Sequence, residues 1–276
     1  PAVEMSGGSA ANTLAGFASL GGNGAFIGKV ARDQLGEVFA HDMTSQGIHY
    51  DTSRFEGGVE TGRCMILVTP DAQRTMNTFL GASVELGPED IEEDLVKRSK
   101  ITYLEGYLFD PDNAKEAFRK AGKIVKEAGT KLALTLSDTF CVDRHRNDFL
   151  ELVDGSVDIL FANEHELKAL FQTESLDEAC SAVTGKCEIT VVTRGEQGSL
   201  ILTGNGPVEV QAQTPQNLID TTGAGDLYAS GFLFGLSKDK SLAECGKLGS
   251  IAAAEVISHM GPRPQTSLSE LVNKAA

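Results

Sequence analysis

The sequence predicts an α/β protein with a mostly parallel central sheet that is flanked by helices. From Gly87 onward, short apolar runs typical of buried strands alternate with helical stretches, and such repeats build parallel sheets covered by helices. Between Ile48 and Ser83 the pattern changes to β-rich runs, which predicts a small β insertion. We therefore expect one large α/β domain, residues 1–48 and 84–276, with an inserted β element at 49–83.

The composition is that of a globular protein with an excess of acidic groups. Of the 276 residues 41% are hydrophobic, and the formal net charge at pH 7 is −15. This charge argues against a surface that binds nucleic acid or an anionic membrane. No apolar run reaches the roughly 18 residues that would predict a membrane-spanning helix, and no leader is visible, so we expect a cytoplasmic protein.

The N-terminal part is expected to form two helices around a short strand. Residues 9–20 have apolar side chains at helical spacing, and two glycines follow as a stop. Residues 24–30 are interpreted as a short strand. Asp33 can cap a second helix that ends at Gly47.

The rest of the chain divides into a hairpin and a series of alternating elements. The hairpin has β-rich runs at 63–69 and 74–80, joined by a turn. The elements expected after it are a helix over 88–98, a strand at 101–105, a helix capped and started by Asp110-Pro111 and running to Ala128, strands at 131–136 and 157–161 with a helix around 148–153 between them, strands at 189–194 and 199–203, a helix that begins near residue 226, and a helix over 242–260.

The stretch from Asp220 to Asp226, DTTGAGD, separates strand-like sequence from an apolar helix. Its small residues let backbone N–H groups approach a bound group where the helix begins, and the unpaired donors of a helix N-terminus suit phosphate. Asp226 stands out because a carboxylate opposes a bound anion unless it is there to accept a proton. The alternative interpretation is a glycine-rich turn with an ordinary Asp in the first helical turn.

This heptapeptide resembles the signature of the ribokinase-like (PfkB) family of carbohydrate and nucleoside kinases. The resemblance implies that Asp226 is the catalytic base and that the backbone of Gly223, Ala224 and Gly225 forms an anion hole. It implies ATP and Mg²⁺ as cofactors. Asp220 and Thr222 could contribute to a monovalent-cation site, with K⁺ as the candidate ion.

The N-terminal glycines resemble the substrate site of this family, in which Gly-Gly and a helical Asn hold the substrate hydroxyls. Gly7, Gly8 and Asn12 occupy these positions, and the stretch at 28–36 also resembles the family. By themselves they would be interpreted as a flexible turn and a solvent-facing helix residue. The family begins with a strand whose Asp binds substrate. Residues 1–6 are too few to hold it, so we expect weakened acceptor binding and an incomplete sheet edge if the chain starts there. The simplest explanation is that the sequence is incomplete at its start.

Two motifs resemble the nucleotide side of the family. Asn163-Glu164-His165-Glu166 follows a strand and resembles N-x-x-E, which implies that Glu166 positions Mg²⁺ through water and that Asn163 lies at the nucleotide. The alternative is helix capping by Asn163 with acidic residues in the first turn, and the two roles are compatible. Thr193, Gly195 and Gly198 match a Thr-x-Gly-x-x-Gly turn that lies along the nucleotide; alone, it would be an ordinary hairpin turn.

In the resembled family the inserted β element at 49–83 is a lid over the substrate. We expect a monomer or a lid-mediated homodimer. The lid looks more like the adenosine-kinase branch and its bacterial relatives than the ribose branch. The residues that carry this likeness are Thr61-Gly62, Cys64, Arg74 and Gly81-Ala82. Met65, Met76 and Phe79 form either an apolar wall for a nucleobase or the packing of the lid onto itself.

The function implied is ATP-dependent phosphorylation of a primary hydroxyl of adenosine or a similar nucleoside. A sugar kinase for ribose, fructose or a related carbohydrate is the alternative within the family, and a nucleotide-binding regulator without turnover is the alternative from another class. A Rossmann dehydrogenase is disfavoured, because no G-x-G-x-x-G opens a helix after a strand. The expected ligands are small molecules, with no nucleic acid and no membrane.

Overall fold

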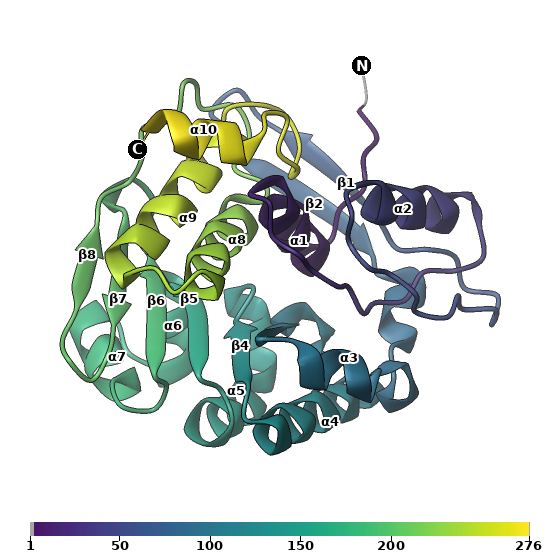
Figure 1. Cartoon of the computed structure of the whole chain (residues 1–276), viewed down its shortest axis with the longest axis horizontal. Coiled ribbons are helices and arrows are strands. Elements are labelled where there is room, and N and C mark those ends of the chain that lie inside the picture. Colours follow the sequence, from purple (N-terminus) through teal and green to yellow (C-terminus); the bar gives the residue numbers. More distant parts are fainter. Residues whose placement is uncertain (1–2, 276) are drawn as a thin grey trace. The chain divides into compact units, whose positions relative to one another are not determined.

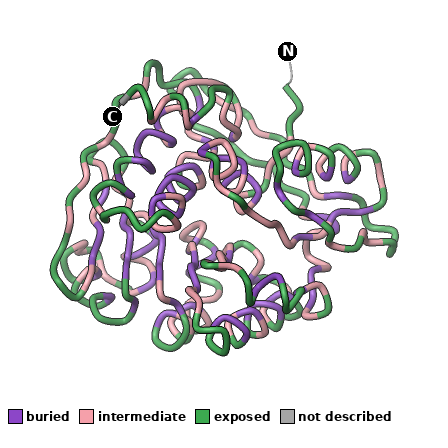
Figure 2. The backbone as a smooth tube through the Cα atoms, viewed as in Figure 1, coloured by how far each residue is buried: buried purple, intermediate pink, exposed green. Residues whose placement is uncertain are grey.

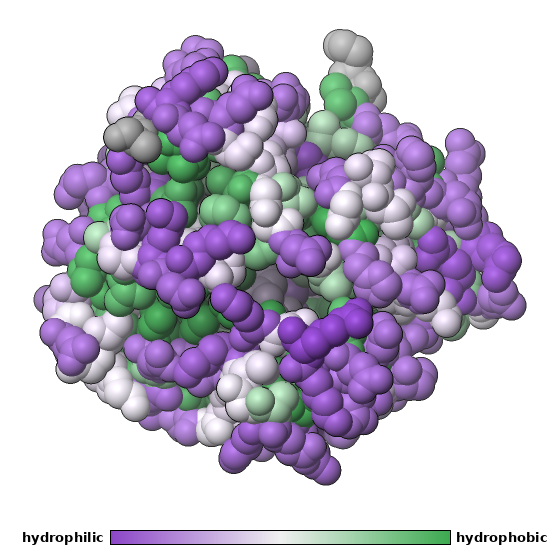
Figure 3. All heavy atoms as spheres, viewed as in Figure 1, coloured by the Kyte–Doolittle hydropathy of each residue, from purple (hydrophilic) through white to green (hydrophobic). Residues whose placement is uncertain are grey.

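The computed structural model describes residues 3–275 and divides the chain into two compact units. Unit 1 comprises residues 1–86 and 213–276, and unit 2 comprises residues 87–212. Hydrophilic residues cover much of the face shown in Figure 3. Within the described residues, no helix combines the length and the apolar character needed to cross a membrane. The role of residues 49–83 as a separate lid domain stays a prediction.

Unit 2 is built on a six-stranded sheet whose strands lie in sequence order (Figure 1). The first three pairings are parallel and the last two are antiparallel, so the prediction of a mostly parallel sheet is confirmed. The three-residue edge strand was not predicted. The strands are β3 (Ile101–Glu105), β4 (Lys131–Thr135), β5 (Ile159–Asn163), β6 (Ile189–Thr193), β7 (Ser199–Leu202) and β8 (Val208–Val210).

The helices of unit 2 are α3 (Glu93–Arg98), α4 (Asp112–Ala128), α5 (Thr139–Gly155), α6 (Glu164–Phe171) and α7 (Leu176–Val183), with single 3₁₀ turns at Pro88–Asp90, Gly106–Phe109 and Gly195–Gln197. The continuous helix predicted over 88–98 is wrong. Lys120 binds the carbonyls of Pro88 and Ile91 at 2.6 and 3.1 Å, which keeps the Ile91 carbonyl out of a helical ladder. The predicted capping by Asp110 is also wrong, because its carboxylate binds Arg144 and His145.

Unit 1 contains α1 (Ser9–Ser19), α2 (Gln34–Ser45), the hairpin strands β1 (Arg63–Val68) and β2 (Arg74–Phe79), a 3₁₀ turn at Gly81–Glu85, and the helices α8 (Ala224–Ser237), α9 (Leu242–Val256) and α10 (Leu268–Ala275). The hairpin is a two-stranded antiparallel sheet of its own, as predicted. Asp33 caps α2 as expected, and its carboxylate also accepts bonds from the backbone and hydroxyl of Thr61 at 2.8 and 2.6 Å. This carboxylate therefore ties the segment before the hairpin to α2.

Two predicted elements of unit 1 differ from the structure. The expected strand at 24–30 is absent from the described residues, which show there only isolated bridges from Ala25 and Ala31 to a neighbouring segment. Helix α9 ends at Val256 rather than at residue 260. The carbonyl of Ile257 turns to accept the N–H of Ile219 at 2.9 Å, and this bond anchors the chain that leads into the DTTGAGD stretch. Of residues 1–6, the first two lie outside the described residues and 3–6 form no strand.

Close helix packing in unit 1 depends on glycines. A Cβ on Gly231 of α8 would lie 2.5 Å from the backbone carbonyl of Leu248 in α9, and a Cβ on Gly16 of α1 would lie 2.4 Å from Leu227 and Ser230 of α8. Helices α1 and α8 therefore approach each other closely, and Figure 2 shows buried residues along α8 and the sheet strands. This approach brings the first turn of α1 to the first turn of α8.

Gly231→Ala should lower the free energy of unfolding by about 1–3 kcal/mol, because the added methyl group meets backbone rather than a flexible side chain. Urea unfolding followed by circular dichroism measures the change. Gly122→Ala in α4 is the matched control: its Cβ would lie 3.5 Å from Leu132, so it should be neutral or stabilise by up to about 1 kcal/mol. Equal effects of the two substitutions would contradict the packing argument.

Candidate active site

The N-terminus of α8 has open backbone donors. Gly223 is its N-cap with φ 82°, and a Cβ there would lie 3.0 Å from Pro262, so this position requires glycine. A Cβ on Gly225 would meet nothing within 4 Å, so space is open beside that turn. Among the described residues, no acceptor lies at the N–H groups of Gly223 and Gly225, whereas the Ala224 N–H contacts the Thr221 carbonyl at 3.3 Å. Two of the three predicted anion-hole donors are therefore free, and the third is partly satisfied.

Asp220 holds this turn in place. One carboxylate oxygen accepts from the N–H and the hydroxyl of Thr222 at 2.9 and 2.6 Å, and the other accepts from the Gly261 N–H at 3.0 Å. Burial acts to raise the pKa of Asp220, but these hydrogen bonds outweigh it and hold the pKa below its usual value. Each oxygen of Asp220 therefore already accepts at least one hydrogen bond from the protein. The monovalent-cation role of Asp220 and Thr222 stays a prediction.

The carboxylate of Asp226 in the first turn of α8 is bonded to the first turn of α1. Ser9 donates to one oxygen at 2.7 Å, and the amide of Asn12 donates to the other at 2.9 Å. Asn12 was predicted from the sequence to lie at the substrate site, whereas Ser9 was not. The two donors fix the direction of the carboxylate, and the residue keeps part of its surface accessible.

Two arginines act on Asp226 through their charge. Burial raises the pKa of Asp226, while the bonds from Asn12 and Ser9 and the positive charges of Arg74 and Arg263 oppose this rise. Arg74 belongs to β2 of the hairpin and also hydrogen-bonds the Thr221 hydroxyl, which lies 3.4 Å from the Ala72 carbonyl. Arg263 follows α9 and binds Asn12. A carboxyl whose pKa is raised in this way is suited to accept a proton.

The glycines before α1 form the entry to this helix. Gly8 is the N-cap of α1 with φ 92°, a conformation that side chains other than glycine rarely adopt. A Cβ on Gly7 would meet nothing within 4 Å. Open space beside Gly7 is compatible with the predicted role at the substrate, and this role stays a prediction.

Unit 2 carries the motifs of the nucleotide side at the carboxyl ends of its strands. The register pairs Asn163, the last residue of β5, with Thr193, the last residue of β6. The turn after Thr193 has Gly195 at φ 57° and Gly198 at φ 82°, and a Cβ on Gly198 would lie 2.0 Å from the Val210 carbonyl. The register therefore brings the two predicted motifs side by side at one edge of the sheet.

Asn163 and Glu166 form a reciprocal cap at the start of α6. The Asn163 side chain accepts from the Glu166 N–H at 2.9 Å, and Glu166 accepts from the Asn163 backbone at 2.9 Å and from its amide at 2.6 Å. Glu166 is 6% exposed, and burial raises its pKa to about 7. Within residues 3–275 no basic side chain forms an ion pair with it. A buried carboxylate without a counter-charge fits the predicted position next to Mg²⁺, which accepts few protein ligands and keeps its waters.

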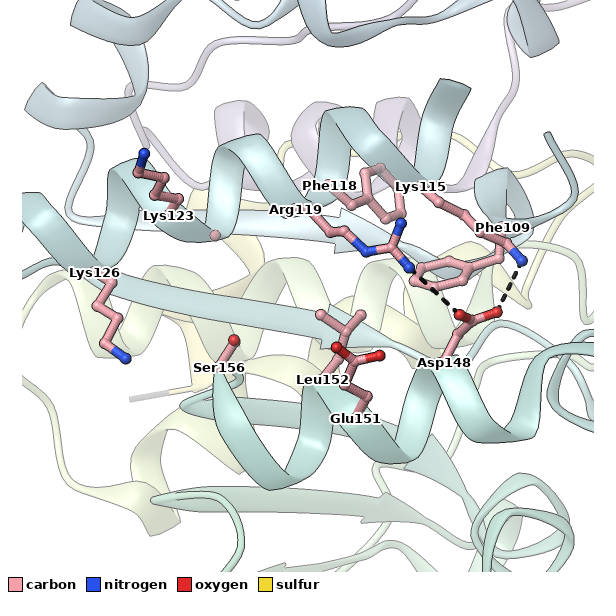
Figure 4. Close-up of a pocket in the computed structure, with 11 residues that line it drawn as sticks. Phe109, Lys115, Phe118, Arg119, Lys123, Lys126, Asp148, Glu151, Leu152 and Ser156 are labelled. Carbon is pink, nitrogen blue, oxygen red and sulfur yellow. Dashed lines mark hydrogen bonds and ion pairs between the residues drawn. The ribbon is translucent and has the colours of Figure 1, made fainter. Parts of the chain in front are cut away.

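A groove of about 270 Å³ lies between α4 and α5 of unit 2 (Figure 4). Lys115 and Arg119 in its wall both pair with Asp148, at 2.8 and 3.7 Å. None of the predicted site residues lines this groove. It is therefore no part of the candidate active site.

The sequence pattern of the pfkB family of carbohydrate kinases matches residues 3–268. The chain belongs to this family. The predicted ribokinase-like fold and the kinase class are thereby confirmed for this PfkB kinase.

Known structures and proteins similar to this PfkB kinase differ in their acceptors. The crystal structure of adenosine kinase from Sinorhizobium meliloti is 53% identical with a TM-score of 0.98, and the match covers 100% of this chain and 85% of that one. The structure of Arabidopsis thaliana ribokinase complexed with ribose and ATP is 25% identical with a TM-score of 0.80. The match covers 96% of this chain and 86% of that one. Probable fructokinase-6, chloroplastic, of Arabidopsis thaliana is 30% identical over 86% of this chain, and the chain spans 64% of its length. ATP is supported as phosphoryl donor, whereas the acceptor is not fixed.

Glu166→Gln in this PfkB kinase should separate capping from metal positioning. Because the single amide oxygen of Gln cannot accept both bonds from Asn163, we expect the free energy of unfolding to fall by about 1–2 kcal/mol while the protein stays folded. The Mg²⁺ concentration that gives half-maximal ATP turnover should rise at least about 10-fold, because the carboxylate beside the metal waters is lost. A Mg²⁺ titration of the rate measures this, with Glu164→Gln in the same helical turn as control. The same Mg²⁺ dependence in both variants would contradict the metal role of Glu166.

Proposed function

We propose that this PfkB kinase transfers the γ-phosphoryl group of ATP to a primary hydroxyl of adenosine or a similar nucleoside. The observation that carries the proposal is the Asp226 carboxylate, oriented by Ser9 and Asn12 at a helix start with free N–H donors. The 53% identity to an adenosine kinase of Sinorhizobium meliloti supports adenosine as acceptor. The fructokinase and ribokinase likenesses support a sugar as the second candidate.

The chemistry asked of Asp226 is the removal of the proton from the acceptor hydroxyl. The alcohol oxygen then bonds to the γ-phosphorus as the bond between this phosphorus and the ADP oxygen breaks, and the proton stays on the carboxylate. The transition state spreads negative charge over the transferring oxygens, and the N–H groups of Gly223 and Gly225 would stabilise this charge without reorganisation. Mg²⁺, when bound, would further neutralise the triphosphate. A non-catalytic regulator would not need a carboxylate oriented in this way.

The two faces of the hairpin support different roles for its apolar residues. Residues directly opposite each other in an antiparallel pair lie on the same face, so Met76, paired with Ile66, shares the face of Arg74. Arg74 reaches Thr221 of the signature stretch, which supports this face as the acceptor side. Met65 and Phe79, 71% and 44% exposed, lie on the opposite face. Met65, Met76 and Phe79 are all exposed, and the Arg63 guanidinium lies 5.0 Å from the centre of the Phe79 ring. We infer that Met76 is the residue of the three that would contribute to a nucleobase wall.

Asp226→Asn should keep ATP binding and lower kcat by at least about 10²-fold, because the amide cannot take the alcohol proton. Calorimetric titration with MgATP and a coupled assay of ADP release measure the two properties. Asp239→Asn is the control, since it makes the same chemical change at an exposed position just after α8. Turnover of Asp226→Asn close to that of the wild type would refute the assignment of the base.

Met76→Ala should raise the KM for adenosine by about 10-fold or more, because the variant loses the apolar contact with the base. Met65→Ala, on the opposite face of the hairpin, should leave this KM unchanged. Steady-state kinetics with adenosine, ribose and fructose measure both effects, and adenosine should have the highest kcat/KM. A higher kcat/KM for ribose or fructose, with no difference between the two Met variants, would favour the sugar kinase.

A further inference from the structure

Arg263 is a partly buried cation of unit 1 that forms no ion pair among the described residues. It lies between Pro262 and Pro264 after α9, and its Nε donates to the Asn12 side-chain oxygen at 2.9 Å. Its other two guanidinium nitrogens lie 4.0 and 3.9 Å from the Met43 sulfur, which is a weak acceptor. Within residues 3–275 no carboxylate lies close enough to Arg263 to form an ion pair.

Keeping such a charge in the fold costs free energy. Burial lowers the pKa of Arg263 to about 10, although the negative charges of Asp42 and Asp226 oppose this shift. The group is still protonated at neutral pH. A partly buried cation that is not neutralised by an ion pair does not stabilise the fold by its charge. The position of the Arg263 charge next to Asn12 and Asp226 points to a role in the candidate active site.

We propose that Arg263 is a positioning residue for proton abstraction, which fixes the Asn12 amide toward Asp226 and keeps the Asp226 carboxylate charged. This inference rests on the proposed function, in which Asp226 accepts the proton of the acceptor. Residues 12, 226 and 263 form one chain of hydrogen bonds, from guanidinium to amide to carboxylate. Helices α1 and α8, which carry the last two groups, lie side by side in Figure 1.

The orientation of the Asn12 amide follows from what Arg263 can do. A guanidinium only donates hydrogen bonds, so the amide oxygen must face Arg263 and the amide NH₂ must face Asp226. In the flipped orientation the amide oxygen would face the carboxylate and its NH₂ would face the guanidinium, and both contacts would be repulsive. An Asn side chain is nearly symmetric in shape, so packing alone discriminates poorly between the two orientations. Arg263 therefore selects the orientation in which Asn12 donates to the base.

The charge of Arg263 also acts on the base itself. The groups that face Asp226 are the neutral Ser9 and Asn12 of α1, Arg74 of the hairpin and Arg263. The negative charge of Asp42 of α2 acts on Arg263, and Asp42 accepts a hydrogen bond from Ser6. Removing the guanidinium would leave Asp226 with one cation instead of two. Ionisation of the base would then require a higher pH.

The test compares Arg263→Met with Arg263→Lys, using MgATP and the acceptor that the wild type phosphorylates fastest among adenosine, ribose and fructose. For Arg263→Met we expect kcat to fall about 10-fold or more, and the acidic limb of the kcat/KM pH profile to move up by about one pH unit. Arg263→Lys keeps the charge, so the acidic limb of its pH profile should stay near that of the wild type. Its kcat should lie well above that of Arg263→Met. If Arg263→Met does not fold, Arg263→Gln takes its place with the same readouts.

A double-mutant cycle with Asn12→Ala tests whether Arg263 acts through Asn12. In the Asn12→Ala background, the further loss of kcat on Arg263→Met should be several-fold smaller than in the wild-type background. A role in stability alone would lower the melting temperature and leave the pH limb unmoved, and that result would overturn the inference. An equal loss of kcat in both backgrounds would also overturn it. Full turnover of Asp226→Asn would instead refute the proposed function itself.

Discussion

The two hydrogen bonds from Ser9 and Asn12 to the Asp226 carboxylate are the constraint on which the candidate site depends. A carboxylate at the N-terminus of a helix benefits from the helix dipole, but the removal of water around it favours the neutral acid. Two neutral donors and two nearby arginines act against that cost. The group is therefore held in one direction while it keeps the ability to take up a proton, which is the balance that a general base requires.

The backbone of unit 1 is organised so that these donors reach Asp226. Gly16 lets α1 approach α8 closely, and Gly231 does the same between α8 and α9. The turn before α8 is held by Asp220, which binds Gly261 after α9, and Arg263 follows two residues later. A single short connection after α9 thus supports the glycine-rich turn and places a cation near Asp226. Changes in this connection should affect chemistry as well as stability.

Local patterns predicted much of the fold and part of the site. The Asn163–Glu166 cap and the hairpin depend on neighbours close in sequence, so their residue spacing was sufficient. The DTTGAGD turn was found from its own residues, but its contact with Gly261 was not. Ser9, Arg74 and Arg263 were missed as partners of the site, because their contacts join residues 217, 147 and 251 positions apart. The strand expected at 24–30 was wrong because its apolar run lacks a continuous ladder partner, which no local pattern reports.

A crystal structure with the acceptor and a non-hydrolysable ATP analogue tests the central claim most directly. The account predicts that the acceptor hydroxyl lies within about 2.6–3.2 Å of the Asp226 carboxylate and that the terminal phosphate of the analogue accepts from the N–H groups of Gly223 and Gly225. The orientation of the Asn12 amide between Arg263 and Asp226 should be retained in that complex. An acceptor hydroxyl directed away from Asp226, or a terminal phosphate remote from the start of α8, would contradict the account.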